Sequence, residues 1–405
     1  MPGWVRAACD RADIISKPHR SHQEAKMFEP DTLRLVWWLL ILVLFAGFVV
    51  TDGFDLGALI LLPWVGKTDE QRRVVLNAVG ATWEGNQTWL ITAVGATFAA
   101  FPAVYSVSFS GTYMVMMLAL FALFARPVGF DYRSKLESRC WRSAWDWALF
   151  TGGLVPTVAF GLLVGNLFIG LPFHLDSDFH AAYSGHFTSL FQPFAMLVAI
   201  AAVALCAMHG GAYVQGRTEP PFARAFARRT TAAALIFALL FAICGGWLAT
   251  SLPGLRFDTV TLLRAPAAGS ARLPQHVAGG WTGNFVRCPG LLALPLLAVL
   301  GAMATALLSR AARWTTAFCS SSLAVLAAIS TAGVTLFPVL LASSIDPASS
   351  LTLWNASSSP KTLKIMLVVA ALFVPLIVLY TGWVYRVLRG PITVEDIQSH
   401  GAKLY

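Results

Sequence analysis

Charged side chains are scarce in this chain of 405 residues. Asp, Glu, Lys and Arg make up 12% of it, whereas hydrophobic residues make up 57% and the mean hydropathy is +0.67. Soluble domains usually carry about 25% charged residues, so this composition excludes an ordinary water-soluble protein. It predicts an all-α polytopic integral membrane protein, because helices satisfy their own backbone hydrogen bonds in lipid.

Cysteine and histidine patterns that hold metals are also lacking. The six cysteines show no CxxC spacing and lie mostly in or beside apolar segments, where free cysteine behaves as a small hydrophobic residue. Of the eight histidines only His209 falls inside a predicted helix, next to two glycines. One such histidine is more typical of a packing residue than of a heme ligand. We therefore expect no metal and no heme on this chain alone and assign any redox centre to a partner.

Nine apolar segments are each long enough to span a membrane, for which about 20 residues suffice. They lie near residues 33–55, 75–100, 103–125, 146–171, 191–214, 230–252, 288–309, 315–342 and 361–386. Seventeen Lys and Arg residues fall on one side of these segments, against seven on the other from Met27 onward. Because cytoplasmic loops keep positive charge, this asymmetry predicts the N-terminus outside and the C-terminus in the cytoplasm.

The net charge of +9 comes mostly from these connections, which form a basic belt of the kind that meets anionic lipid headgroups. We expect no nucleic-acid partner, because no basic stripe with interleaved aromatic residues lies elsewhere. The start of the chain conflicts with the orientation, since its five basic residues would cross without an apolar signal. We interpret residues 1–26 as a disordered tail or an over-extended gene start, and residues 27–405 as the transmembrane domain.

Three acids lie within predicted spans, where ionisable groups are costly and usually mark ion or proton pathways. Asp52 and Asp55 in "TDGFDLG" are three residues apart and share one helix face. At about 1.5 Å per residue, this pair lies near the cytoplasmic boundary and Glu84 lies about 15 Å deeper. The acids thus predict a proton route from the cytoplasm to the middle of the membrane.

Polar and aromatic residues surround Glu84 in the stretch "WEGNQTW". The supporting residues we expect are Trp83, Asn86 and Gln87, together with Arg126 of a later motif, and Trp89 lies in the same stretch as the first three. Amide and indole groups can hydrogen-bond a carboxyl group that takes and gives protons. In the alternative interpretation, Glu84 is a neutral hydrogen-bonded residue between helices, and the two aspartates only cap a helix or pair with the basic belt.

Arg126 begins the motif "RPVGFDYRSK", where we expect the third span to stop at Arg126 and Pro127. One interpretation makes this motif a membrane-surface anchor of Trp, Tyr and Arg residues. The other has Arg126 reach back to pair with Asp52 or Asp55.

Eight motifs taken in order resemble one family. They are "TDGFDLG", "WEGNQTWLITAVGATFAAFP", "SGTY", "RPVGFDYRSK", "WDW", "GNLFIGLPF", "NASSSPKTL" and "LYTGWVYRVLRGPIT". Together they resemble subunit II of the cytochrome bd-type quinol oxidases, over nearly everything from Met27 to Tyr405. The resemblance implies nine transmembrane helices in the bacterial inner membrane, arranged as two four-helix bundles plus a peripheral helix.

The resemblance also implies partners and cofactors. Subunit I would bind heme b and heme d, oxidise ubiquinol or menaquinol, and reduce dioxygen to water. Subunit II would supply scaffold and a cytoplasmic proton route to the oxygen-reducing heme. Asp52, Asp55 and Glu84 match the acids of that route, although the family often has Asp where this chain has Glu84. Some members add an oxygen path near the residue that matches Trp89, a structural quinone, or small accessory subunits.

Two other classes of protein compete with this interpretation. Ion-coupled secondary transporters also hold acids near the midplane, usually within repeats, but the second half of this chain has no matching acid pair. A purely structural assembly subunit would use the acids for packing alone. Co-purification with hemes separates a transporter from an oxidase subunit, and a carboxylate variant separates scaffold from proton route.

Overall fold

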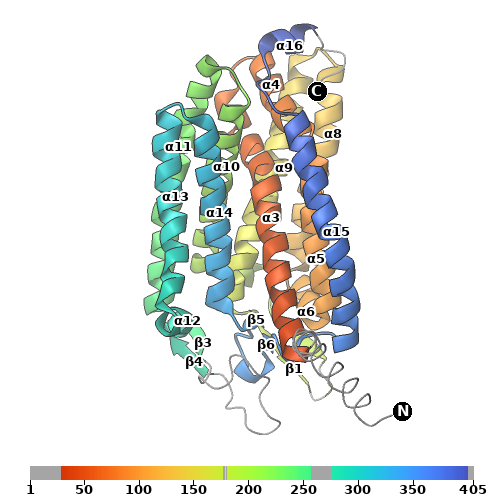
Figure 1. The fold of residues 1–405 in the computed structure, drawn as a ribbon, viewed down its shortest axis with the longest axis vertical. Helices are drawn as coiled ribbons and strands as arrows, with labels where there is room; N and C mark the ends of the chain where they lie inside the picture. Colours follow the sequence, from red (N-terminus) through yellow and green to blue (C-terminus); the bar gives the residue numbers. More distant parts are fainter. Residues whose placement is uncertain (1–28, 177, 179, 257–274, 400–405) are drawn as a thin grey trace, which may run out of the picture.

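The computed structural model describes residues 29–176, 178, 180–256 and 275–399. The prediction for residues 1–26 lies outside this range. Figure 1 shows an elongated bundle of long helices that run between two ends. One end carries α4 (Asp69–Gly80), α8 (Ala125–Tyr132) and α16 (Val394–Ser399), and we call it the basic end. The other carries three small β-hairpins, and we call it the hairpin end.

Eight helices of the described part are long and apolar enough to cross a membrane, or nine if one bent pair counts as a span. Seven spans are built on α3 (Pro30–Val65), α9 (Arg139–Ile169), α10 (Pro193–Gly216), α11 (Pro220–Thr250), α13 (Ala293–Arg310), α14 (Trp314–Leu336) and α15 (Pro360–Val387). The eighth joins α7 (Tyr113–Leu123), α8 and η1 (Arg133–Lys135), and the bent pair is α5 (Trp83–Ala100) with α6 (Pro102–Gly111). The predicted helical, polytopic membrane fold is confirmed.

Short strands and helical turns lie at the hairpin end. Three antiparallel pairs form there, β1 (Phe173–Leu175) with β2 (Ala181–Tyr183), β3 (Pro253–Arg256) with β4 (Gln275–Ala278), and β5 (Val339–Leu341) with β6 (Leu351–Thr352). Short helical turns join them, namely η2 (Phe187–Leu190), η4 (Gly280–Thr282), α12 (Gly283–Arg287), η5 (Pro289–Leu292) and η6 (Pro347–Ser349). The predicted span 315–342 is therefore too long, because its last residues form β5.

Two other predicted spans are divided differently in the structure. The span 75–100 breaks at Ala81 and Thr82, between α4 and α5. After α5 the chain bends by 119° into α6, because Pro102 has no backbone N–H to continue the helix. The third span consequently occupies residues 113–135 rather than 103–125. Arg126 lies inside this span and does not end it.

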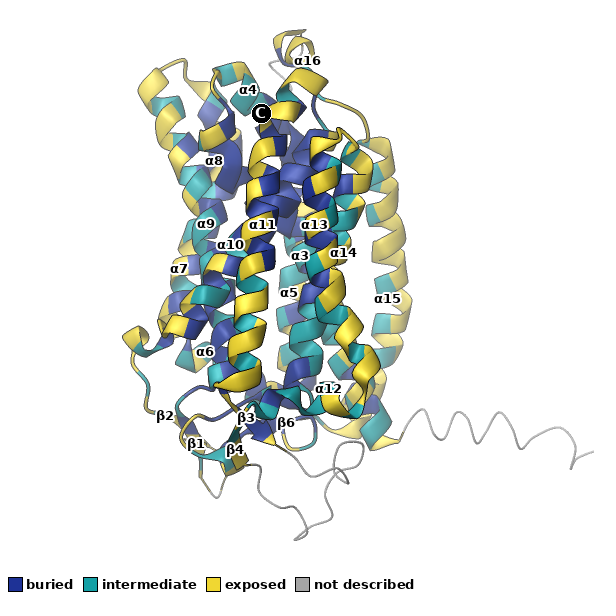
Figure 2. Cartoon of the chain, turned by 90° about the vertical axis from the view of Figure 1, so that its left-hand side faces the viewer, coloured by how far each residue is buried: buried dark blue, intermediate teal, exposed yellow. Residues whose placement is uncertain are grey.

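The helices pack in two neighbourhoods. Helices α10, α11, α13 and α14 contact one another, α3 contacts α5 and α9, and α7 contacts α9. Helix α3 also packs on α10 and so joins the two neighbourhoods. Figure 2 shows buried residues concentrated along the inward faces of these helices. The grouping into two four-helix bundles and the direction of insertion stay predictions.

Glycines allow the closest approach in the bundle. A side chain at Gly57 of α3 would overlap the backbone carbonyl of Cys206 in α10, and one at Gly210 would overlap the backbone at Ala58. The backbones of α3 and α10 therefore touch directly beside the "TDGFDLG" motif. This contact fixes the part of α3 that carries Asp52 and Asp55.

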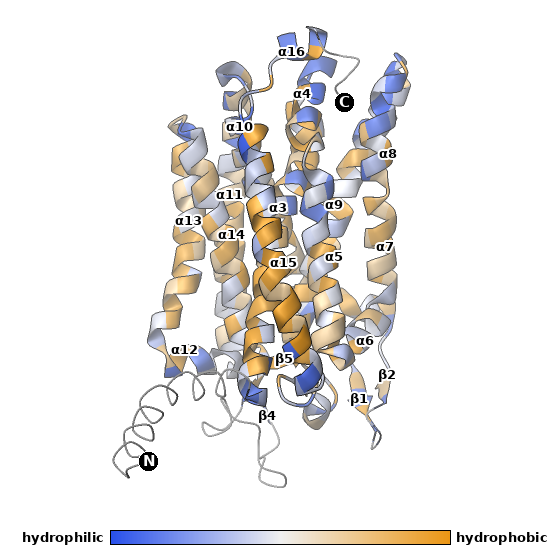
Figure 3. Cartoon of the chain, turned by 45° about the vertical axis from the view of Figure 1, so that its right-hand side comes forward, coloured by the Kyte–Doolittle hydropathy of each residue, from blue (hydrophilic) through white to orange (hydrophobic). Residues whose placement is uncertain are grey.

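Helix α15 stands at the edge of the bundle. Its most apolar 18-residue window is only 6% buried within this chain. Figure 3 shows this helix strongly hydrophobic through the middle, whereas the basic end is hydrophilic around α4, α8 and α16. Near the hairpin end, the indole of Trp37 donates a hydrogen bond of 2.9 Å to the carbonyl of Leu363 and ties α15 to α3.

Candidate functional site

Asp52, Asp55 and Arg126 form a buried ionic cluster, which we call the Arg126 cluster. Each of the three residues is 0% exposed. Arg126 of α8 binds Asp52 of α3 through two hydrogen bonds, Nη1 to Oδ2 at 2.9 Å and Nη2 to Oδ1 at 2.6 Å. Its Nη2 also lies 3.9 Å from Oδ2 of Asp55. The predicted pairing of Arg126 with the aspartates is confirmed, and Arg126 itself is no surface anchor because it is buried.

Local structure holds this cluster in place. The spacing of three residues puts both carboxyl groups on one face of α3. The ring of Trp83, in the first turn of α5, lies against the Arg126 guanidinium, with Cζ 5.3 Å from the ring centroid. Trp83 also stacks on Phe130 of α8, with centroids 5.5 Å apart. The positive charge is thus held by an aromatic face as well as by carboxylates.

The cluster contains two carboxyl groups against one guanidinium. Both oxygens of Asp52 accept from Arg126, whereas Oδ1 of Asp55 is buried without a hydrogen-bond partner among the described residues. That oxygen is open to a proton, since a protonated carboxyl group gains a donor that an ionised one lacks. One added proton also brings the net charge of the three groups to zero, which lowers the cost of burying them. The arrangement can therefore hold a proton and pass it between two acids.

The start of α5 connects this cluster to α15. Asn86 donates from Nδ2 to Oδ2 of Asp55 at 2.7 Å, and the hydroxyl of Tyr385 donates to Oδ1 of Asn86 at 2.7 Å. The predicted supporting residues Trp83 and Asn86 both contact the cluster. The sequence interpretation missed Tyr385, whose signal was a hydroxyl near the end of the last apolar segment.

Glu84 does not join the Arg126 cluster. It is exposed on α5, as is Gly85, whereas Asn86 is buried. Because Asn86 contacts Asp55, the first turn of α5 lies level with the pair, and the predicted depth difference of about 15 Å is wrong. The reason is that α3 continues to Val65 beyond the aspartates, while the second predicted span is broken before Glu84.

Trp89 and Gln87 lie farther along α5, where Gln87 is half-exposed. Trp89 packs in a hydrophobic group with Phe48, Leu56 and Phe160, and these three also line a cavity of about 890 Å³. Apolar side chains of α3, α9, α10, α11, α13 and α14 form most of the cavity wall. Such a space suits an apolar molecule rather than an ion.

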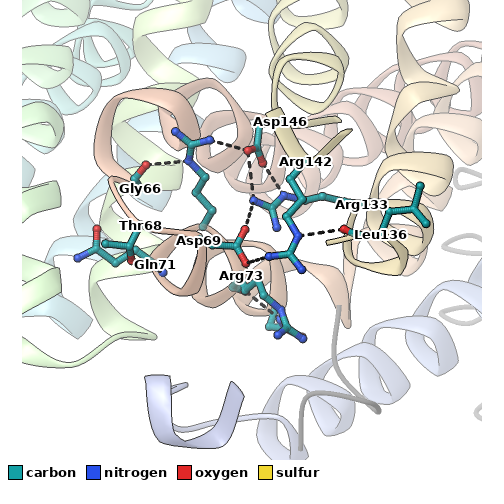
Figure 4. A network of polar contacts seen from close by, with 11 residues as sticks. Gly66, Thr68, Asp69, Gln71, Arg73, Arg133, Leu136, Arg142 and Asp146 are labelled. Carbon is teal, nitrogen blue, oxygen red and sulfur yellow. Dashed lines mark hydrogen bonds and ion pairs between the residues drawn. The ribbon is translucent and has the colours of Figure 1, made fainter. Parts of the chain in front are cut away.

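A second ionic network lies at the basic end (Figure 4). Arg133 binds Asp146 at 2.6 Å and Asp69 at 2.9 Å. Arg72 binds the same Asp146 at 2.6 Å, and Arg142 binds the same Asp69 at 2.8 Å. These ion pairs join α4, η1 and α9. The sequence interpretation missed them, although the motifs "RPVGFDYRSK" and "WDW" contain Arg133 and Asp146.

His209 does not offer a ligand to a heme. Its Nδ1 lies 2.8 Å from the Ser321 hydroxyl and its Nε2 lies 2.9 Å from the Val50 carbonyl, so both ring nitrogens are engaged. The ring also stacks on Phe318, with centroids 5.1 Å apart. The residues around His209 therefore do not fit a heme. Among the described residues, no group of three or more His, Cys, Asp and Glu side chains is placed to hold a metal ion.

Comparisons with known proteins agree with the motifs. The family model for cytochrome bd terminal oxidase subunit II matches residues 33–388. Cytochrome bd-I ubiquinol oxidase subunit 2 of Escherichia coli (strain K12) is 42% identical over 382 residues, which cover 94% of this chain and 100% of that protein. Cytochrome bd ubiquinol oxidase subunit 2 of Bacillus subtilis (strain 168) is 30% identical over 374 residues, covering 91% of this chain and 99% of that protein.

A solved structure agrees on the fold. The bd oxidase from Geobacillus thermodenitrificans contains a chain that matches with a TM-score of 0.62 at 14% identity, covering 88% of this chain and 98% of that chain. At that identity the match speaks for the fold alone. Together with the family match over residues 33–388, these findings show that the chain belongs to the cytochrome bd terminal oxidase subunit II family, whose members are multi-pass proteins of the bacterial inner membrane.

Proposed function

We propose that this chain pairs with a heme-bearing subunit I and supplies both scaffold and a cytoplasmic proton route toward the oxygen-reducing heme. In this proposal subunit I oxidises quinol and reduces dioxygen to water. No residue here transfers electrons. The role of this chain is to bind and hand on protons that the reduction of oxygen consumes.

The Arg126 cluster carries the proposal. A buried pair of acids with one guanidinium is expensive to keep in a membrane protein, so a purely structural role would be served more cheaply by apolar side chains. Asp52 and Asp55 share one guanidinium, so one added proton balances their charge, and Asn86 connects Asp55 to the first turn of α5. These contacts support a proton-holding site at the start of that helix.

The outer face of α5 is the surface proposed to meet subunit I. Its exposed residues are mostly small or polar, namely Glu84, Gly85, Thr88, Thr92 and Gly95, with Ile91 and Phe98 as the two large apolar ones. Small and polar residues on one stripe of a membrane helix favour close packing with another helix, whereas lipid favours large apolar ones. Docking there would cover the Glu84 carboxyl group, which could then pass protons from this chain to the partner.

The distribution of charge supports an orientation with the basic end in the cytoplasm. Basic residues of α4, η1 and the start of α9 gather at this end, as do Arg217 and Arg389, in agreement with the rule that cytoplasmic loops keep positive charge. The Arg126 cluster lies in the half of α3 nearer to this end. Protons would therefore enter from the cytoplasm over a short distance.

The apolar cavity supports a second contribution. Its volume of about 890 Å³ and its wall of aliphatic and aromatic side chains suit the isoprenoid chain of a structural quinone. The contact of its lining residues with Trp89 also suits an oxygen path from α5. Extraction of the purified complex followed by chromatographic quinone assay tests the first of these. The variant that fills the cavity is Gly245→Phe, because Gly245 lines it and a Cβ atom there meets nothing within 4 Å among the described residues.

The test of the main proposal is quinol-driven oxygen consumption by the complex with subunit I. The variants are Asp55→Asn, Glu84→Gln and Glu84→Asp, with heme spectra as the measure of assembly. We expect Asp55→Asn and Glu84→Gln to keep their heme content and lose most turnover, because both replace an acid by an amide that cannot carry a proton. Glu84→Asp should retain turnover, because it keeps the carboxyl group.

Other outcomes separate the rival classes. Normal turnover in Asp55→Asn and Glu84→Gln would leave a scaffold role only. Purification without any heme-bearing partner, together with ion-dependent uptake of a solute into vesicles, would favour the ion-coupled transporter instead.

A further inference from the structure

A row of side-chain hydroxyl groups leads from the basic end to the Arg126 cluster. Tyr213 lies one turn before the end of α10, where its phenol group contacts Arg217 and the hydroxyl of Thr82. The Thr82 hydroxyl lies near the phenol group of Tyr385 as well, and it makes a long hydrogen bond of 3.4 Å to the Val79 carbonyl. Tyr385 then donates to Asn86, which donates to Asp55.

Two helices and the break between two others provide these three hydroxyl groups. Tyr213 comes from α10 and Tyr385 from α15, and Thr82 occupies the break between α4 and α5. Their position is fixed by aromatic packing, since Phe54 stacks on Tyr213 with centroids 3.8 Å apart and meets the edge of Tyr385 at 6.3 Å. The break after α4 therefore places a hydroxyl group between two phenols.

The row of hydroxyl groups reaches solvent beside Tyr213, at the basic end. Arg217 follows the last turn of α10 and is half-exposed, whereas Tyr213 is 8% exposed. Arg217 also donates a hydrogen bond to the carbonyl of Gly390, in the segment that precedes α16. Water at the basic end can therefore approach Tyr213 beside a fixed positive charge.

Asn86 brings the inner end close to the acid. Its Oδ1 accepts from Tyr385 and its Nδ2 donates to Asp55, each at 2.7 Å. Because the phenol and carboxyl oxygens are bound to the two polar atoms of one amide, they lie on neighbouring sites, which a bridging water molecule beside the amide can connect. An amide does not itself carry a proton readily, so it serves here to hold the two oxygens in position.

Resting on the proposed function, we propose that Tyr213, Thr82 and Tyr385 form the cytoplasmic entry by which protons reach Asp55. In one transfer, the O–H bond of Tyr385 breaks as an O–H bond forms on the Asp55 carboxylate through the bridging water. Thr82 returns a proton to the Tyr385 oxygen and takes one from Tyr213, which is refilled from water at the basic end. One proton moves inward, and all three hydroxyl groups return to their starting state.

Tyr385→Phe and Tyr213→Phe test this proposal, because phenylalanine keeps the ring packing on Phe54 and removes only the hydroxyl group. Tyr380→Phe is the matched control on α15, since Tyr380 is 63% exposed on the outer surface of that helix. The complex with subunit I is placed in vesicles, reduced fully, and mixed with oxygen. A pH dye then follows proton uptake while heme spectra report assembly and oxidation.

We expect both tyrosine variants to keep full heme content and to slow proton uptake about tenfold or more, with Tyr380→Phe unchanged. Slow uptake in Asp55→Asn with normal uptake in Tyr385→Phe would overturn this inference and leave the proposed function standing. Normal uptake in Asp55→Asn would overturn both. Should Tyr385→Phe fail to assemble, 3-fluorotyrosine at position 385 keeps the hydroxyl and makes it more acidic. An unchanged uptake rate with that residue would also overturn the inference.

Discussion

Arg126 and Asp52 are 74 residues apart in sequence, yet they meet through two parallel hydrogen bonds where neither side chain is reached by solvent. The pair joins α8 to α3 and fixes the angle at which the third span crosses the first. A guanidinium offers this two-point geometry, whereas an ammonium group does not.

Loss of Arg126 should leave a buried negative charge without its partner. We expect Arg126→Gln to destabilise the protein by about 3–5 kcal/mol, measured as lost yield and a lowered thermal midpoint of the purified complex. The double variant Arg126→Gln with Asp52→Asn removes both charges and should recover much of the loss. A double variant as unstable as the single one would contradict the ion-pair explanation.

Asp146 should be equally important at the basic end, because it binds both Arg72 and the buried Arg133. We expect Asp146→Asn to lower stability by about 3 kcal/mol and to raise proteolysis between α8 and α9. The matched control is Asp131→Asn, an exposed acid of the same region, which should change stability by less than about 0.5 kcal/mol. Equal effects of the two variants would show that the ion pairs of Asp146 stabilise the protein no more than an exposed acid does.

Gly57 should tolerate no side chain, because a Cβ atom there overlaps the backbone of Cys206 in α10. We expect Gly57→Ala to cost about 1–3 kcal/mol, visible as a lower thermal midpoint. Gly246→Ala is the control, since a Cβ atom at Gly246 of α11 meets nothing within 4 Å in the described structure. Indistinguishable midpoints would show that α3 and α10 can separate at little cost.

A larger side chain at Gly85 should weaken assembly with subunit I and leave the folding of this chain unchanged. A Cβ atom at this position also meets nothing within 4 Å among the described residues, but Gly85 lies on the face of α5 proposed to meet subunit I. We expect Gly85→Leu to fold normally and to reduce co-purification of subunit I about tenfold or more, since a larger side chain blocks close helix packing. Gly246→Leu should leave co-purification unchanged, and a similar loss there would argue against a docking face on α5.

Asp346 at the hairpin end should make the thermal midpoint of the protein depend on pH. The hydrogen bond from the Ser349 hydroxyl holds the pKa of the Asp346 carboxyl below its ordinary value. A lowered pKa in the folded state stabilises above the unfolded pKa of about 3.9, and this contribution is lost as pH falls through the folded value. The thermal midpoint of wild type should therefore exceed that of Asp346→Asn at pH 7, and the difference should shrink below about pH 4. Asp178→Asn, an exposed acid of the same end, should show no such change.

Helix number and membrane character could be predicted because they depend on local composition. Apolar runs identify the spans whatever their neighbours are. The division of the second and third spans could not be predicted in this way, since the apolar pattern continues through Thr82 and through the bend at Phe101. The pairing of Arg126 with the aspartates was predictable because a buried carboxylate requires a cation.

The face on which a side chain lies was harder to predict. Glu84 and Asn86 are both polar residues in the same motif, and sequence spacing shows that they point in different directions. It does not show which of them faces α3. That choice depends on the packing of α5 against Asp55, and it reverses the expected roles of the two residues. Tyr385 was missed for the same reason, because its partner is on α5.

Helix α15 is fastened by hydrogen bonds near both ends, from Trp37 to the Leu363 carbonyl and from Tyr385 to Asn86. By helical rise these two attachments are about 33 Å apart, close to the thickness of the hydrocarbon layer. These two hydrogen bonds therefore fix the length of α15 that lies between the two membrane interfaces. A thinner or thicker bilayer would strain one of the two bonds, so lipid chain length should change how firmly the phenol of Tyr385 is held near the basic end.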